Sequence, residues 1–161
     1  MREDESVALR LAWDHNRDRL WRALLAWSGD RDVASDAIAE AFAQAAPRLD
    51  RIADLDGWLW RASFKIAAGM LDSARRRAPV GTDPMTDQMS PSTQLPDEAA
   101  ALVAALAQLS ESDRLAIVLC QVGGWSAKEV GGLVGASPGA IRVRLHRAKS
   151  RLRTIMEVHD D

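Results

Sequence analysis

The residues best suited to chemistry in this chain are the arginines and lysines of its last third. No acidic residue stands between Glu129 and Glu157, so nothing within that stretch neutralises its positive charge. Guanidinium and ammonium groups in such a run bind phosphates, and arginine also bonds in bidentate fashion to guanine. The chemistry indicated is recognition of a nucleic acid.

These cations lie on a predicted helix that follows a tight turn. Ser137 is a suitable N-cap, Pro138 suits the first helical position, and Gly135 can take the positive φ of the bend. A shorter helix, a glycine turn and a basic second helix form the helix-turn-helix pattern. The other interpretation is a solvated basic helix on a bundle. The apolar residues of the second helix recur on one face: Ile141, Leu145, Ala148 and Leu152.

The sequence offers no catalytic constellation. His15, His146 and His159 lie far apart, and none stands at a metal-ligand spacing from Cys120, the single cysteine. No glycine-rich phosphate loop follows a strand, because no convincing strand is present. We therefore expect no enzyme activity, no metal site and no cofactor.

Composition indicates a folded chain with separated charges. Of its 161 residues 47% are hydrophobic, and the net charge of −2 hides acids concentrated in the first hundred residues and cations in the last third. The charged N-terminus shows no signal peptide, and no apolar run is long enough to span a membrane. We expect a cytoplasmic protein with no membrane insertion.

Helical periodicity predicts an all-α fold. Residues 78–97 hold most of the prolines with polar residues between them, which is typical of a flexible linker. The linker divides the chain into two small helical domains, 1–77 and 98–161, and the second contains the helix-turn-helix. Each domain is near the lower size limit for independent stability. The helices are expected over 6–28, 32–46, 58–77, 98–109 and 111–122, before the helix-turn-helix at 126–153.

Local signals predict several boundaries and faces. Gly29 stops the first helix, residues 48–57 form a loop with three aspartates, and residues 158–161 fray. Ser110 and Asp113 are spaced as a capping box. The inward face of the helix 58–77 is expected to be Trp58, Leu59, Ala62, Ile66 and Met70.

The order of these features resembles the extracytoplasmic-function (ECF) sigma factors of bacterial RNA polymerase, within the sigma-70 family. The second domain follows the family's region 4 pattern without a gap over LSESDRLAIVLCQVGGWSAKEVGGLVGASPGAIRVRLHRAKSRLR. The first resembles region 2 through GDRDVASDAIAEAFAQAAPRL and WLWRASFKIA. The resemblance implies a factor that directs core polymerase to specific promoters in transcription initiation.

The resemblance also implies partners for each surface. Asp36 and Glu40 lie where the family docks the clamp helices of the polymerase β′ subunit, and region 4 meets the β flap. Promoter DNA is the second partner, and an anti-sigma factor that covers these faces is the third. The residues that lie where the family grips the melted −10 strand are Trp58, Arg61, Lys65, Arg75 and Arg76.

The last helix lies where the family reads the −35 element. Within it we assign base edges to Arg142 and Arg147, and contact with a thymine methyl to Val143. Gly139 lies on the same DNA-facing side. Phosphate contacts are assigned to Lys128, Arg144, Lys149 and Arg151, together with N–H groups near Ser137.

This chain departs from the family pattern in both domains. The loop before Trp58 is short and acidic, with Asp50, Asp54 and Asp56, which disfavours a phosphate nearby. Gly131 and Gly132 replace better helix formers at a cost of about 1 kcal/mol each.

Two other functions fit the same sequence. A helix-turn-helix regulator would bind DNA without engaging polymerase, and its first domain would serve dimerisation or sensing. A protein-interaction module would use the basic helix to bind an acidic partner. The acidic pair Asp36 and Glu40 distinguishes the sigma factor from the regulator, because only the sigma factor would need this face to bind polymerase. A steep salt dependence of DNA binding would argue against the interaction module.

Overall fold

The computed structural model describes residues 1–77 and 95–160, and every regular element within these ranges is helical. The predicted all-α class is confirmed. Most of the predicted linker, residues 78–94, lies outside the described residues.

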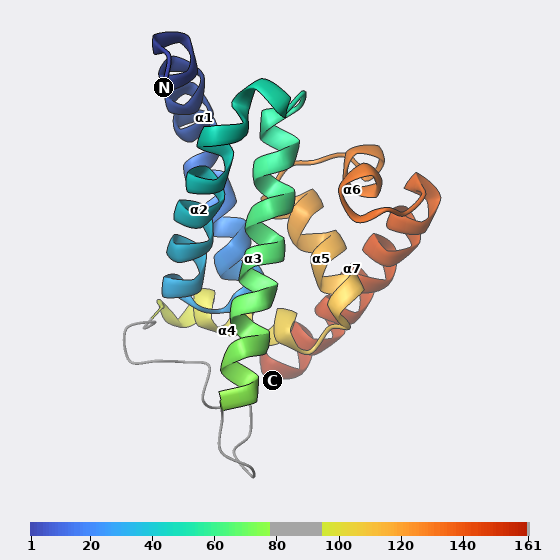
Figure 1. The fold of residues 1–161 in the computed structure, drawn as a ribbon. Helices are drawn as coiled ribbons and strands as arrows, with labels where there is room; N and C mark the ends of the chain where they lie inside the picture. Colours follow the sequence, from blue (N-terminus) through green and yellow to red (C-terminus); the bar gives the residue numbers. More distant parts are fainter. Residues whose placement is uncertain (78–94, 161) are drawn as a thin grey trace.

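Three helices build the first half of the molecule (Figure 1): α1 (Glu3–Ser28), α2 (Arg31–Ala45) and α3 (Leu55–Arg77). Gly29 ends α1 as predicted, with a left-handed φ of 72°. Asp30 begins α2, because its carboxylate accepts hydrogen bonds from the backbone N–H groups of Asp32 and Val33. A short 3₁₀ helix, η1 (Ala46–Arg51), leads toward α3.

The predicted loop over 48–57 is wrong at both ends. Residues up to Arg51 belong to η1, and α3 begins at Leu55 rather than at Trp58. The reason lies in Asp54, whose Oδ1 accepts a hydrogen bond from the N–H of Gly57 at 3.1 Å. Asp54 therefore caps α3 and extends it toward the N-terminus.

The buried face of α3 is broader than predicted. Leu59 is fully buried as expected, whereas Trp58, Ala62, Ile66 and Met70 are half-buried and pack at the edges of the core. The broader face arises because α3 contacts α2 on one side and the second half of the molecule on another. The further buried apolar side chains of α3 are those of Trp60, Phe64, Ala67 and Leu71.

The second half consists of α4 (Asp97–Ala107), α5 (Glu111–Ile117), a π-helical turn η3 (Val118–Val122), α6 (Ala127–Val134) and α7 (Pro138–Asp160). Ser110 Oγ accepts a hydrogen bond from the N–H of Asp113 at 3.3 Å, which is one part of the predicted capping box. The helical backbone of α7 continues to Asp160, so the predicted fraying from Val158 is wrong for residues 158–160.

The two halves share one hydrophobic core. Helix α1 contacts α4 and η3, and α3 contacts α6. At this junction Trp60 meets Trp125 edge to face, with ring centroids 5.5 Å apart. The guanidinium of Arg19 lies over both rings, 5.3 Å from one centroid and 5.8 Å from the other. The junction supplies burial that two domains of this size would lack separately.

A buried polar network lies beside this junction. Asn16 is fully buried, and its amide nitrogen donates to the carbonyl of Ala12 at 2.9 Å and to Oδ1 of Asp56 at 2.6 Å. Its Oδ1 accepts a hydrogen bond from Nε1 of Trp60 at 3.0 Å. One side chain of α1 thus fixes the start of α3 and the orientation of the Trp60 indole.

Asn16→Leu should lower the free energy of unfolding by about 1–3 kcal/mol, because the substitution leaves the Trp60 N–H and the Asp56 carboxylate without their buried partner. Urea denaturation followed by tryptophan fluorescence measures this loss. Gln44→Leu removes a half-buried amide whose hydrogen bond to Glu40 is exposed to solvent, so it is the control and should change stability much less. An Asn16→Leu chain as stable as the wild type would contradict the assigned role of the network.

Candidate nucleic-acid interface

Helices α6 and α7 form the predicted helix-turn-helix. Ser126 Oγ accepts from the N–H of Glu129 at 3.1 Å, and Glu129 Oε1 accepts from the N–H of Ser126 at 3.0 Å. The backbone hydrogen bond from Ser126 lowers the pKa of the Glu129 carboxyl, because it stabilises the charged form that closes the cap. Gly135 takes a φ of 75°, which ends α6 and makes the turn.

The start and the buried face of α7 agree with the sequence pattern. Ser137 Oγ accepts a hydrogen bond from the N–H of Ala140 at 3.1 Å, so Ser137 caps the helix. Ile141 and Ala148 are fully buried, and Leu145 and Leu152 are half-buried against the core. This apolar stripe fixes which residues of α7 face outward.

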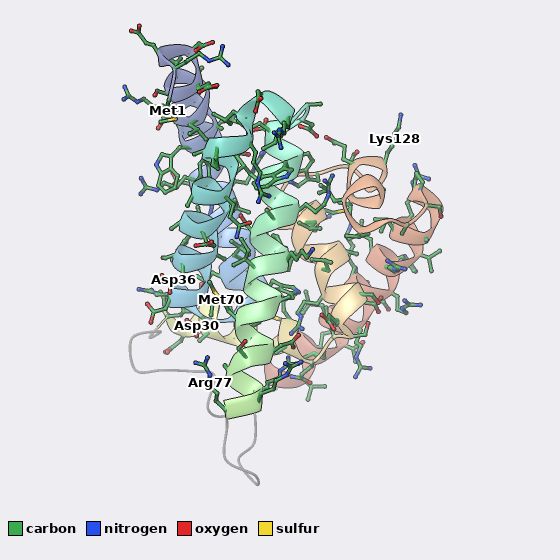
Figure 2. The ribbon with its side chains drawn as sticks, in the orientation of Figure 1. Met1, Asp30, Asp36, Met70, Arg77 and Lys128 are labelled. Atoms are coloured by element: carbon green, nitrogen blue, oxygen red, sulfur yellow. The ribbon has the colours of Figure 1, made fainter. Side chains whose placement is uncertain are left out.

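The predicted −35 residues lie on the exposed surfaces of α6 and α7, which contact each other. Val143 is 60% exposed, which is unusual for a valine and leaves its methyl groups open to a ligand. Figure 2 shows Lys128 pointing away from the body of the molecule. Arg144 is half-buried, whereas the exposed members are Lys128, Ser137, Gly139, Arg142, Val143, Arg147, Lys149 and Arg151.

Arg147 has an intramolecular partner that the sequence pattern did not reveal. Its Nε donates to Oδ2 of Asp113 at 2.8 Å and its Nη2 donates to Oδ1 at 2.7 Å. The Asp113 side chain is 6% exposed, whereas that of Arg147 is 57% exposed. These hydrogen bonds lower the pKa of the Asp113 carboxyl. The carboxylate therefore ties α7 to α5 instead of completing the capping box with Ser110.

The predicted −10 residues divide into two groups on α3. Trp58, Arg61 and Lys65 line one groove, and Arg48 of η1 lines it as well. Arg48 was missed because it lies in a segment predicted as loop, where no helical periodicity marks a face. Arg75 and Arg76 are exposed at the C-terminal end of α3, away from this groove. Arg75 lies 3.8 Å from Asp72 in an exposed ion pair: Nη1 to Oδ1.

The acidic residues fall into structural and exposed sets. Asp36 and Glu40 are both exposed on α2, and Figure 2 shows where Asp36 lies on that helix. Glu40 Oε1 accepts a hydrogen bond from Nε2 of Gln44 at 3.0 Å, a partner that the sequence did not indicate. In the acidic segment before Trp58, Asp54 caps α3 and Asp56 holds Asn16.

Three other features complete the description of the site. Within residues 1–77 and 95–160, no group of three or more His, Cys, Asp or Glu side chains could hold a metal ion. No helix in the described part of the chain is long and apolar enough to cross a membrane. Cys120 is half-buried, and burial raises the pKa of its thiol.

Comparison with known proteins gives concordant results. Residues 99–152 match the family model described as Sigma-70, region 4. The ECF RNA polymerase sigma factor SigL of Mycobacterium tuberculosis is 32% identical over 164 residues, which cover 95% of this chain and 91% of SigL. SigE of Mycolicibacterium smegmatis is 29% identical over 167 residues, which cover 92% of this chain and 63% of the length of SigE.

Two solved structures share the fold. The sigma factor RpoE of Bartonella quintana, solved in complex with the anti-sigma factor NepR, superposes with a TM-score of 0.70 and 20% identity, over 98% of this chain and 99% of RpoE. CnrH, solved in complex with the cytosolic domain of CnrY, superposes with a TM-score of 0.72 and 22% identity, over 95% of this chain and 90% of CnrH. Because the likeness to SigL runs through both helical halves and the region 4 model falls on the helix-turn-helix, the chain belongs to the ECF RNA polymerase sigma factors.

Proposed function

We propose that the chain directs core RNA polymerase to specific promoters, with residues 1–77 as region 2 and residues 98–161 as region 4. The observation that carries this proposal is the alignment with SigL, which covers 95% of the chain and so includes the first half as well as the helix-turn-helix. A regulator that binds DNA without polymerase would share only the second half with such relatives, so that alternative is not favoured. The protein acts by binding, without catalysing a reaction, in the cytoplasm.

Region 4 reads the −35 element through α7. Arg142 and Val143 are exposed near the start of this helix, where a recognition helix meets base edges. Gly139 adds no side chain at this end, so the backbone can approach DNA closely. Arg147 makes the second arginine contact with a base, while phosphates are held by Lys128, Arg144, Lys149 and Arg151 and by N–H groups near Ser137.

Region 2 binds the −10 strand through the groove on α3. Arg61 and Lys65 offer charge for phosphates, and Arg48 on η1 adds to them on the same groove. The half-buried Trp58 offers a ring face on which an unstacked base can stack. Arg75 and Arg76 extend the positive surface along the end of α3.

The polymerase core binds two surfaces of the chain. Asp36 and Glu40 present an acidic face of α2 to the clamp helices of the β′ subunit, and region 4 contacts the β flap. An anti-sigma factor is a further partner, a proposal supported by the structural relative RpoE, which was solved in complex with the anti-sigma factor NepR.

Charge reversal on α2 should separate polymerase binding from folding. We expect the Asp36→Lys, Glu40→Lys double variant to lose both binding to core polymerase and promoter-specific transcription, because both side chains are exposed and neither supports the core. Gel filtration with core polymerase and a run-off transcription assay measure the two losses.

The matched control is the Glu3→Lys, Asp4→Lys double variant, which changes charge by the same amount on the exposed start of α1. This control should retain activity. Full transcription by the α2 variant would contradict the assigned docking surface, and a wild-type chain without core binding would favour the DNA-binding regulator.

Two single substitutions on α7 should have different signatures. Arg142→Ala should weaken binding to the preferred promoter by about 1–3 kcal/mol and relax the preference at one base pair, because it removes a base contact. Lys149→Ala should weaken binding to all DNA sequences alike, because it removes a phosphate contact. It should also lower the slope of log affinity against log salt concentration by about 1. Holoenzyme binding to promoter duplexes over a range of salt concentrations measures both. Equal losses across sequences for Arg142→Ala would contradict its assignment.

A further inference from the structure

The ion pair between α5 and α7 has a geometry that suits base recognition. We propose that Asp113 is a positioning residue for the −35 element: its carboxylate holds Arg147 so that the free end of the guanidinium meets a guanine. The inference rests on the proposed function of α7, and it adds a residue outside the recognition helix to the determinants of specificity.

The hydrogen bonds occupy only one edge of the guanidinium. Asp113 accepts hydrogen bonds from Nε at 2.8 Å and from Nη2 at 2.7 Å, so it occupies the Nε–Nη2 side of the guanidinium group. Arginine has five N–H donors in a plane, and three of them remain, on Nη1 and on the second hydrogen of Nη2. These are the donors that bond end-on to O6 and N7 of guanine. One arginine can therefore hold the carboxylate and the base at the same time.

Burial makes Asp113 a fixed support. The residue is 4% exposed, and its N–H is bonded to Ser110 Oγ at the start of α5. Arg147 is exposed, and an open groove beside the pair is lined by His146 and Arg151 of α7. The carboxylate is thus anchored in the protein while the arginine remains accessible to a ligand.

Fixing the arginine before DNA arrives favours selectivity. A long exposed side chain loses rotamer freedom when it binds, and prior ordering removes part of that cost. The neighbouring negative charge also reduces the attraction of Arg147 for any phosphate, whereas the directed bonds to guanine remain. Asp113 should therefore raise the ratio of specific to non-specific binding more than it raises total affinity.

The opposite role would follow if the pair broke on binding. Asp113 would then compete with DNA for Arg147, and its removal would strengthen binding. The two roles predict opposite changes in base preference, so a selection experiment distinguishes them.

The test is selection from a promoter library randomised in the −35 element, with the full chain bound to core RNA polymerase. Arg147→Ala should reduce the preference for guanine at one base pair by about tenfold. Asp113→Asn keeps the side-chain size but removes the charge, and it should reduce the preference at that same base pair by a smaller factor. The Asp113→Asn, Arg147→Ala double variant should be no less selective than Arg147→Ala alone.

Glu129→Gln is the matched control. It also removes one negative charge from the second half of the molecule, at the start of α6, but the hydrogen bonds of Glu129 join it to Ser126 and not to an arginine of α7. Glutamine can still close the capping box. The base preference of this variant should equal that of the wild type, even where its overall affinity for DNA rises.

A measurement on the wild-type side chains covers the case in which Asp113→Asn fails to fold. The Arg147 Nε–H resonance of the ¹⁵N-labelled chain, assigned by its absence in Arg147→Lys, should remain protected from exchange with water when the preferred duplex is bound. Loss of protection on binding would show that the ion pair breaks and would overturn the inference.

The outcomes for the two proposals differ. The inference is overturned, while the proposed function stands, if Arg147→Ala reduces the base preference at one position and Asp113→Asn does not. The same holds if Asp113→Asn binds the preferred promoter more tightly and more selectively than the wild type. If the wild-type holoenzyme selects no sequence at all, the proposed function fails, and the inference fails with it.

Discussion

The Trp60 indole is the contact on which the relation between the two halves of the molecule depends. It is 1% exposed, its Nε1 is held by Asn16, and its ring meets Trp125 of the second half with Arg19 over both rings. A Cβ at Gly123 would lie 2.9 Å from the Trp60 ring, so the absence of a side chain there lets the turn after η3 approach so closely. The position of α6 relative to α3 follows from this packing.

The parts of the structure that could be predicted from the sequence are those that depend on neighbours along the chain. The helix start at Ser137 and the turn at Gly135 are local, and both were predictable from residue type and spacing. The buried face of α3 was only partly predictable, since Trp60 is covered by residues from both halves. The bond between Asp113 and Arg147 joins residues 34 positions apart, and no periodicity indicates it.

Acidic residues serve two purposes in this fold, and the distinction bears on nucleic-acid binding. Asp54, Asp56 and Asp113 each bond to a group of the protein itself, so their carboxylates are directed toward N–H donors. Asp36 and Glu40 lie exposed on α2, where Glu40 accepts a hydrogen bond from Gln44 of the same helix. Because these three carboxylates are engaged by groups of the protein, they offset less of the charge that the cations of α3 and α7 present to a ligand. A net charge of −2 is therefore compatible with two basic surfaces.

Helix α3 contributes both to the groove that contains Trp58 and to the packing between the two halves of the molecule. Arg61 and Lys65 line the groove that holds Trp58, and they also border an apolar pocket shared with Leu115 and Leu133 of the second half. The residue between Trp58 and Arg61 that faces the junction is Trp60, so one turn of α3 serves both the groove and the packing of the halves. A change in how the second half sits on α3 would therefore alter the surroundings of the groove cations directly. In this fold the geometry of the groove on α3 depends on where the second half of the molecule lies.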